Sequence, residues 1–436
     1  MTEVAAPPPA DQPAAAPPSP ALMRRAVFAS VIGNGLEWFD FLVYGFFSAQ
    51  IAAAVFPSDD PVISQLLTWA TFAIGFLVRP LSGVVLGLYA ERAGRLKALS
   101  LMIGLMAAGT LLVGVTPPAS QIGIAAPLLV IFARVLQGIS VGGEYGGATA
   151  LLVEYAPPHR RSLFGSFQMT SQAVSLTLAS FAAFSLGSLL SAQDLGDWGW
   201  RIPFLLGALI GPIGIWMRLT IPEPPEFQRA KSDAPRPTLG AIFRRDGRQM
   251  LAAAGTIVPL TLSVYVWTVY MPGTAARSFG LSPAAAPLST MLAGLSLLVL
   301  VPVAGAWGDR IRAWRIYPWA AAVFALGSAA LFAWIVQAPS WGRLITAQLL
   351  AVPVIAILWG LSPAMLAGLF PTRERSTGMA IGYNTAVILF GGLAPFILSA
   401  WDRATGDPLA PAWYTLAACA LGLVLMQARA RDRDLS

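Results

Sequence analysis

Apolar segments long enough to cross a membrane recur along almost the whole chain, separated by short polar or proline-rich breaks. A helix needs about 20 mostly apolar residues to span the hydrocarbon core of a bilayer. Twelve segments meet this requirement, and we predict a transmembrane helix in each. The predicted spans are 25–54, 62–90, 97–116, 124–153, 164–190, 200–220, 249–275, 283–305, 316–337, 343–369, 376–401 and 409–427. The chain is therefore expected to be an all-α membrane protein.

The composition agrees with a lipid environment and excludes several kinds of site. Of the 436 residues, 56% are hydrophobic and 11% are charged, whereas about a quarter of a soluble globular protein is charged. A single cysteine, Cys419, and a single histidine, His159, exclude a disulfide framework and a Cys/His metal cluster. The sequence also lacks a Walker motif and an H-E-x-x-H zinc motif. We therefore expect no metal, nucleotide or redox cofactor.

The distribution of positive charge predicts the orientation of the helices. Most of the 28 Lys and Arg residues fall in the loops of one side, which the positive-inside rule assigns to the cytoplasm. Both termini are then cytoplasmic, and the chain is expected to be a monomeric, multi-pass protein of the cell (inner) membrane. This topology explains the net charge of +7 better than nucleic acid does, because the basic residues form no binding stripe.

A long polar segment divides the chain into two similar halves. The expected units are a disordered cytoplasmic tail at 1–23, a six-helix bundle at 24–220, a cytoplasmic interdomain loop at 221–248, a second six-helix bundle at 249–428 and a cytoplasmic tail at 429–436. The loop sequence GLYAERAGRLK is echoed in the second half by GAWGDRIRAWR, and YAPPHRRS is echoed by LFPTRERS. The two offsets are nearly equal, which indicates a duplicated six-helix unit.

The first of these loops resembles the signature of the major facilitator superfamily, G-x-x-x-D-R-x-G-R-[RK]. Glu91 stands in for the acidic residue, and Leu96 departs from the pattern. The resemblance implies twelve helices in two pseudo-symmetric six-helix bundles, with a latch that closes the interior while the site faces outward. Alternatively, the charges of the loop only set the topology. The residues expected to form this gating motif are Gly87, Glu91, Arg92, Gly94, Arg95, Glu154, Asp309 and Arg310.

Five further stretches are similar to the metabolite:proton symporter branch of that superfamily. They are GNGLEWFDFLVYG at 33–45, FLVRPLSG at 76–83, RVLQGISVGGEYGGA at 134–148, VEYAPPHRRSLFGSFQ at 153–168 and DWGWRIPF at 197–204. Within the branch, the stretches YVWTVYMPG at 265–273 and FGGLAPFILSAWDRATGD at 390–407 look most like citrate and tricarballylate carriers. The resemblance implies transport of a small organic acid together with a proton.

Ionisable side chains inside the predicted spans mark the candidate site. Glu37 and Asp40 lie near the midplane of the first span, Arg79 lies in the second span, and Arg134 and Glu144 lie in the fourth. Each such group costs about 2.5–3.5 kcal/mol or more on insertion, so it should face protein or water and have a partner. The expected pairs are Glu37 or Asp40 with Arg79, and Glu144 with Arg134. An alternative is that these pairs only stabilise the fold.

Proton coupling requires a group that gains and loses a proton as the site opens to either side. Because His159 lies in a loop, this role is expected to fall to a carboxylate, with Asp40 favoured over Glu37 and Glu144. A substrate anion that competes for a buried guanidinium would free a carboxylate to take up a proton. We therefore expect the carboxylates of the first span to face a water-accessible cavity between the two halves.

The buried guanidinium groups suit a carboxylate substrate, because their planar fork binds a carboxylate through two parallel hydrogen bonds. Uncharged polar residues of the spans could add hydrogen bonds, although helix packing explains each of them equally well. The expected substrate-binding residues are Asn34, Arg79, Arg134, Gln137, Gln172, Tyr265, Thr268 and Asn384.

Together these features predict a proton-coupled symporter that imports a di- or tricarboxylate, such as citrate or tricarballylate, by alternating access of its two halves. The alternative is a carrier of a zwitterion or a monocarboxylate, of the betaine, proline or shikimate type. An intramembrane enzyme is disfavoured because the spans hold no nucleophile–base or metal constellation. A sensor without transport is disfavoured because no signalling domain adjoins the spans.

Overall fold

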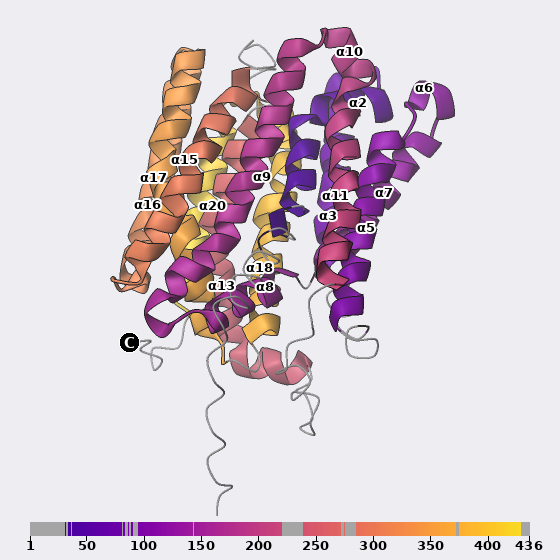
Figure 1. The fold of residues 1–436 in the computed structure, drawn as a ribbon. Coiled ribbons are helices and arrows are strands. Elements are labelled where there is room, and N and C mark those ends of the chain that lie inside the picture. Colours follow the sequence, from indigo (N-terminus) through magenta and orange to yellow (C-terminus); the bar gives the residue numbers. More distant parts are fainter. Residues whose placement is uncertain are drawn as a thin grey trace, which may run out of the picture.

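The computed structural model is almost entirely helical (Figure 1). It describes residues 31, 34–35, 37–80, 82, 86, 89, 95–142, 144–219, 239–271, 274, 285–371 and 375–428. The predicted tails at 1–23 and 429–436 lie outside these residues, as does most of the interdomain loop. Within the described part, seven helices are long and apolar enough to cross a membrane, and the bent pair Glu37–Phe46 and Ser48–Val55 adds an eighth.

The first half of the chain supplies the helices of the first six predicted spans. They are Glu37–Phe46, α2 (Ser48–Val55), α3 (Pro61–Leu77), α5 (Arg95–Val115), α6 (Ala119–Ile122), α7 (Ala125–Val141), α8 (Glu144–Tyr155), α9 (Arg161–Leu189), α10 (Ala192–Asp197) and α11 (Ile202–Leu219). Short 3₁₀ turns, η1 (Pro158–Arg160) and η2 (Gly199–Arg201), precede α9 and α11.

The second half supplies the remaining spans. Its elements are α13 (Leu239–Val264), η3 (Tyr265–Tyr270), α15 (Ala285–Gly308), α16 (Ala313–Gln337), α17 (Trp341–Leu369), α18 (Arg375–Val387), η4 (Ile388–Gly392), α19 (Ala394–Thr405) and α20 (Ala410–Met426). Each predicted span thus contains a helix or a run of consecutive helices. The protein has the predicted fold of twelve transmembrane helices in two pseudo-symmetric bundles.

Besides the bent first span, two spans contain changes of helix type that apolarity alone does not reveal. The seventh and eleventh spans pass through the π-helical turns η3 and η4. Such turns are rare and frequently lie at functional sites. The turn η3 contains Tyr265 and Thr268, both expected to bind substrate.

The start of the seventh span differs from the prediction. A loop was expected as far as residue 248, but α13 begins at Leu239 and includes the charged residues Arg244, Arg245 and Asp246. The physical reason is that apolarity marks the part of a helix inside the bilayer, whereas the helix itself can extend beyond it. Residues 239–248 of the predicted interdomain loop are therefore helical.

The two halves meet along a few helices, and the others lie at the periphery. Helix α9 packs against α15 and α17, α3 packs against α19, and α8 packs against α18. By contrast, α5 and α11 pack mainly against each other and, for α5, against α7. In Figure 1, α5 and α11 lie on the side of the molecule away from α15, α16 and α17. The first half thus has an interior of its own, distinct from the interface between the halves.

Two names are used below for the ends of the molecule. The inner end carries the starts of α9 and α18 and was predicted to face the cytoplasm. The outer end carries the start of α3 and the end of α19. In Figure 1 the inner end is at the bottom, near the labels of α8, α13 and α18.

Candidate functional site

A buried ion pair lies in the interior of the first half. The carboxylate of Asp40, on the first helix, accepts a hydrogen bond from Arg134 on α7, with 3.0 Å between Oδ2 and Nη1. The hydroxyl of Thr110, on α5, donates to the other carboxylate oxygen over 2.7 Å. The side chains of Asp40 and Arg134 are 2% and 0% exposed, respectively. Three helices of the first half therefore converge on this one carboxylate.

Gln137 bonds both Arg134 and Thr110, so the four side chains form one hydrogen-bonded network. Its Oε1 accepts from Nη1 of Arg134 at 2.6 Å, and its Nε2 donates to the Thr110 hydroxyl at 3.2 Å. The ring of Tyr44 lies beneath the guanidinium, whose central carbon is 3.7 Å from the ring centroid. Removing one partner of such a buried pair leaves an uncompensated charge and is strongly destabilising. The network therefore pairs the charges of Asp40 and Arg134 within the first half.

The observed pairing differs from the expected one. Asp40 was expected to pair with Arg79 and to face the interface between the halves, but its partners Thr110, Arg134 and Gln137 all belong to the first half. Depth along a helix predicts how far into the membrane a charge lies, but not which neighbouring helix its face contacts. The polar stripe of the first helix is wide enough for its members to face different neighbours.

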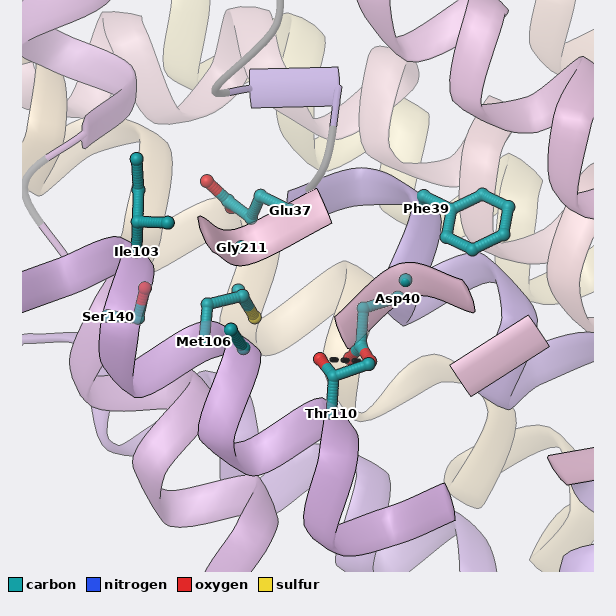
Figure 2. Close-up of a pocket in the computed structure, with 10 residues that line it drawn as sticks. Glu37, Phe39, Asp40, Ile103, Met106, Thr110, Ser140 and Gly211 are labelled. Atoms are coloured by element: carbon teal, nitrogen blue, oxygen red, sulfur yellow. Dashed lines mark hydrogen bonds between the residues drawn. The ribbon is translucent and has the colours of Figure 1, made fainter. Parts of the chain in front are cut away.

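A pocket lies beside Asp40 in the same interior. Glu37 and Asp40 line it from the first helix, Met106 and Thr110 from α5, and Gly211 from α11 (Figure 2). Its volume is about 30 Å³, which is sufficient for water. Glu37, 6% exposed, is placed one helical turn before Asp40. Two carboxylates thus share one small cavity.

Arg79 occupies a second location, next to residues of the other half. Its guanidinium carbon lies 4.2 Å from the ring centroid of Phe76, whose ring is 5.5 Å from that of Tyr265 on η3. Arg79 is 1% exposed, and its Nε and Nη1 have no hydrogen-bond partner in the described part of the chain. The Tyr265 hydroxyl also has none there. Unpaired buried donors of this kind are suited to an anionic ligand.

One aromatic ring contacts both guanidinium groups. The centroid of the Phe41 ring is 4.8 Å from the central carbon of Arg79 and 5.4 Å from that of Arg134. Phe41 directly follows Asp40 in the first helix. A displacement of either arginine therefore acts on the ring that contacts the other.

The amides expected to bind substrate have differing environments. Asn34 donates to the Ser171 hydroxyl at 2.6 Å and accepts from Gln168 at 2.8 Å, so its polar atoms are used in attaching the first helix to α9. Gln172, also on α9, is buried with neither polar side-chain atom bonded within the described residues. The hydroxyl of Thr268 donates to the Val264 carbonyl of its own helix. Gln172 is therefore the free amide of this group.

Asn384 belongs to a contact between the halves. Its Nδ2 donates to the carbonyl of Gly142 at 3.2 Å. One residue earlier, Tyr383 stacks on Tyr145 of α8, with the ring centroids 3.6 Å apart and the rings nearly parallel. These contacts join α18 to the fourth span. Asn384 therefore lies at a contact between the two halves.

Charged residues close the inner end across the two halves. Glu154, at the end of α8, forms an ion pair with Arg375 at the start of α18, with 2.7 Å between the charged atoms. Asp309, just after α15, accepts from the backbone N–H groups of Ser162 and Leu163 at 2.7 and 3.1 Å. A carboxylate at this position is favourable because the first N–H groups of a helix lack partners within it.

A glycine of the repeated loop motif permits this approach. A Cβ atom on Gly305 would lie 2.5 Å from the Ser166 hydroxyl oxygen and 3.0 Å from the Ser162 carbonyl oxygen. Any larger residue would push α15 away from α9 and withdraw Asp309 from its position.

The expected gating motif is only partly within the described residues. Glu154 and Asp309 bridge the halves, whereas Arg310 is exposed. The sequence did not single out Arg375, although it was visible as one of the two arginines in the repeated RERS segment. Outside the description lie Gly87, Glu91, Arg92 and Gly94 and the side chains of Arg95 and Glu144.

The sequence of this chain is similar to those of named transporters. The family of sugar (and other) transporters matches residues 26–238. The citrate-proton symporter of Salmonella typhi is 33% identical over 409 residues, which cover 93% of this chain and 94% of the relative. The ectoine/proline transporter ProP of Corynebacterium glutamicum is also 33% identical, over 91% of this chain and 82% of the relative.

A solved structure supports the fold. The crystal structure of the D-xylose-proton symporter superimposes with a TM-score of 0.76 over 93% of this chain and 97% of that protein. The sequence identity of 18% makes this a likeness of fold only.

Proposed function

The chain belongs to the metabolite:proton symporter family of the major facilitator superfamily, and we propose that it imports a small organic acid with two or three carboxylates, such as citrate or tricarballylate. Its relatives are transporters, so it is a membrane-spanning proton symporter and not an enzyme. The similarity to citrate-proton symporters over nearly the whole chain supports the choice of substrate. The proposal places the protein in the inner membrane with both termini in the cytoplasm.

The observation that carries the proposal is the different surroundings of two buried arginines. Arg134 donates from Nη1 to Asp40 and Gln137 inside the first half, and its Nε and Nη2 have no hydrogen-bond partner in the described part. Arg79 lies next to residues of the second half, and its Nε and Nη1 have no hydrogen-bond partner in the described part. We assign Arg79 to the substrate carboxylate, with Tyr265 and Gln172 as additional hydrogen-bonding groups. Asp40 is then the group that carries the proton, and Arg134, Thr110 and Gln137 hold its charged form.

Coupling follows from these assignments. A proton on Asp40 removes the attraction to Arg134, so the guanidinium is free to move against the Phe41 ring, which also contacts Arg79. Substrate bound at Arg79 acts on the same ring from its other side. Proton and substrate together shift the balance between inward-open and outward-open states, because each binds one state better than the other.

A second candidate substrate is a zwitterion. ProP of Corynebacterium glutamicum, named for ectoine and proline, is as similar to this chain as the citrate carriers are. Aromatic rings suited to a substituted ammonium group lie near Arg79, namely those of Trp38 and Tyr265, with centroids 6.0 Å apart. Competition by proline or betaine against labelled citrate distinguishes the two substrates.

Asp40→Asn tests the proposal. Purified protein in proteoliposomes should lose pH-driven accumulation of labelled substrate and retain exchange of internal for external substrate. Asp59→Asn, the same chemical change at an exposed position of the outer end, is the matched control and should leave both intact. Accumulation that survives in Asp40→Asn would remove Asp40 from proton coupling.

A further inference from the structure

The pocket beside Asp40 belongs wholly to the first half. Its walls come from the first helix, α5, α7 and α11, and none of its residues lies beyond Gly211. The helices α5 and α11 pack mainly within the first half and lie away from α15, α16 and α17 in Figure 1. The pocket therefore lies in the first half, and its residue Glu37 also interacts electrostatically with Tyr265 and Tyr383 of the second half.

The pocket provides Asp40 with a free side. A carboxylate has about four lone-pair positions, and Thr110 and Arg134 each donate one hydrogen bond to Asp40. In Figure 2, Thr110 from α5 meets Asp40 at the pocket, and Glu37 reaches the same space from the first helix. The cavity volume of about 30 Å³ accommodates water between these polar groups.

Small residues keep this space open. A Cβ atom on Gly207 would lie at ordinary contact distance from Thr110 and Phe39, 3.4 and 3.5 Å away. An alanine therefore fits at this position, whereas a branched side chain extends into the cavity. Ile103 lines the pocket from α5 and offers a second position at which the volume can be reduced.

We infer that this pocket is a hydrated proton route to Asp40, shared with Glu37, and that the proton reaches the carrier separately from the substrate. The inference rests on the proposed role of Asp40 as the proton carrier. It assigns to Glu37 a place on the route and to Gly207 the function of keeping the route open. Substrate enters between the halves, whereas the proton passes through the interior of the first half.

Filling the pocket tests the route. Gly207→Ala and Gly207→Val form a series of increasing volume, and Ile103→Phe reduces the cavity from another wall. Gly327→Val is the matched control, because Gly327 on α16 has no atom near the position of an added Cβ. Two rates are measured in proteoliposomes: proton uptake triggered by labelled citrate, read by an entrapped pH dye, and exchange of citrate at equal pH.

The expected result is a loss of proton uptake that grows from Gly207→Ala to Gly207→Val, with exchange retained and Gly327→Val unchanged. If Gly207→Val or Ile103→Phe elutes as a single folded species and takes up protons at the parental rate, the proposed route is overturned. A parallel fall of exchange and proton uptake would overturn it as well, because the pocket would then only support the fold. Asp40→Asn, measured alongside, reports separately on the proposed function.

Discussion

Arg403, near the end of α19, forms an ion pair with Asp60 at the start of α3, across 343 residues of sequence. This contact bridges the two halves at the outer end, while Glu154 and Arg375 bridge them at the inner end. The two halves are thus bridged at both ends, and Arg79 is buried. The proposed alternating access requires an occluded state between its two open states.

Removing the outer ion pair should favour the outward-open state. In Arg403→Gln we expect faster hydrogen–deuterium exchange at the start of α3 and the end of α19, with no change at the start of α18. Arg343→Gln is the control, because the Arg343 guanidinium bonds only the Trp334 carbonyl of the same half among the described residues. Equal exchange in Arg403→Gln and the parent protein would show that the pair does not hold the outer end.

The outer ion pair should also be insensitive to moderate acid. The hydrogen bond from Arg403 lowers the pKa of Asp60 below 3.8, and the backbone N–H of Val62 adds to this. A lowered carboxylate pKa means that the contact stabilises the closed end at and above the ordinary value, and is lost only as the pH falls through the lowered one. Exchange at α3, corrected for intrinsic rates, should be unchanged between about pH 7 and about pH 5.

At the inner end, reversing both charges of the Glu154–Arg375 ion pair should restore the contact that reversing either charge alone disrupts. Glu154→Arg and Arg375→Glu each place like charges together and should open the inner end, while the double variant should restore closure. The pair is partly exposed, with side chains 36% and 17% accessible, so its coupling should be at most about 1 kcal/mol. Hydrogen–deuterium exchange over α18 and the start of α9 measures this. A double variant as open as the single ones would contradict the pairing.

The Phe41 ring should be required for the coupling of proton and substrate transport but not for substrate binding. In Phe41→Leu the contacts of the ring with both guanidinium groups are lost, so we expect weaker pH-driven accumulation at nearly unchanged substrate affinity. Phe41→Tyr keeps the ring and serves as the conservative control. Affinity from thermal shift and accumulation in proteoliposomes are compared for the two variants. Full accumulation in Phe41→Leu would show that the arginines communicate by another route.

Arg79→Lys should weaken substrate binding. Lysine keeps the charge but loses the planar fork, and hydrogen bonds to charged groups contribute about 1.5–3 kcal/mol, so a loss of about 10- to 100-fold in affinity is expected. Arg201→Lys is the control, because Arg201 bonds the Thr116 carbonyl at the outer end. Titration calorimetry of the purified variants measures both. An unchanged affinity in Arg79→Lys would place the substrate elsewhere.

The spans could be predicted because apolarity over about 20 residues reports directly on the solvent around a helix. Apolarity does not depend on the hydrogen-bonding pattern of the backbone, so the π-turn at Tyr265–Tyr270 could not be predicted from it.

Which residues place a charge inside the membrane could be predicted, but not which of them form contacts. Asp40 and Arg134 were identified because charge at membrane depth is costly, yet their pairing depends on how α5 and α7 pack on the first helix. Arg375 and Asp60 were missed because charges at helix ends are common, and only the folded chain shows that each meets a residue of the other half.

The most direct test is uptake of labelled citrate by the parent protein in proteoliposomes under an imposed pH gradient, acidic outside. Proton-coupled import of a multivalent acid predicts accumulation above the external concentration, its loss on adding a protonophore, and no competition by excess proline or betaine. Equal citrate levels on both sides at every gradient, or accumulation of proline or betaine in place of citrate, would contradict it.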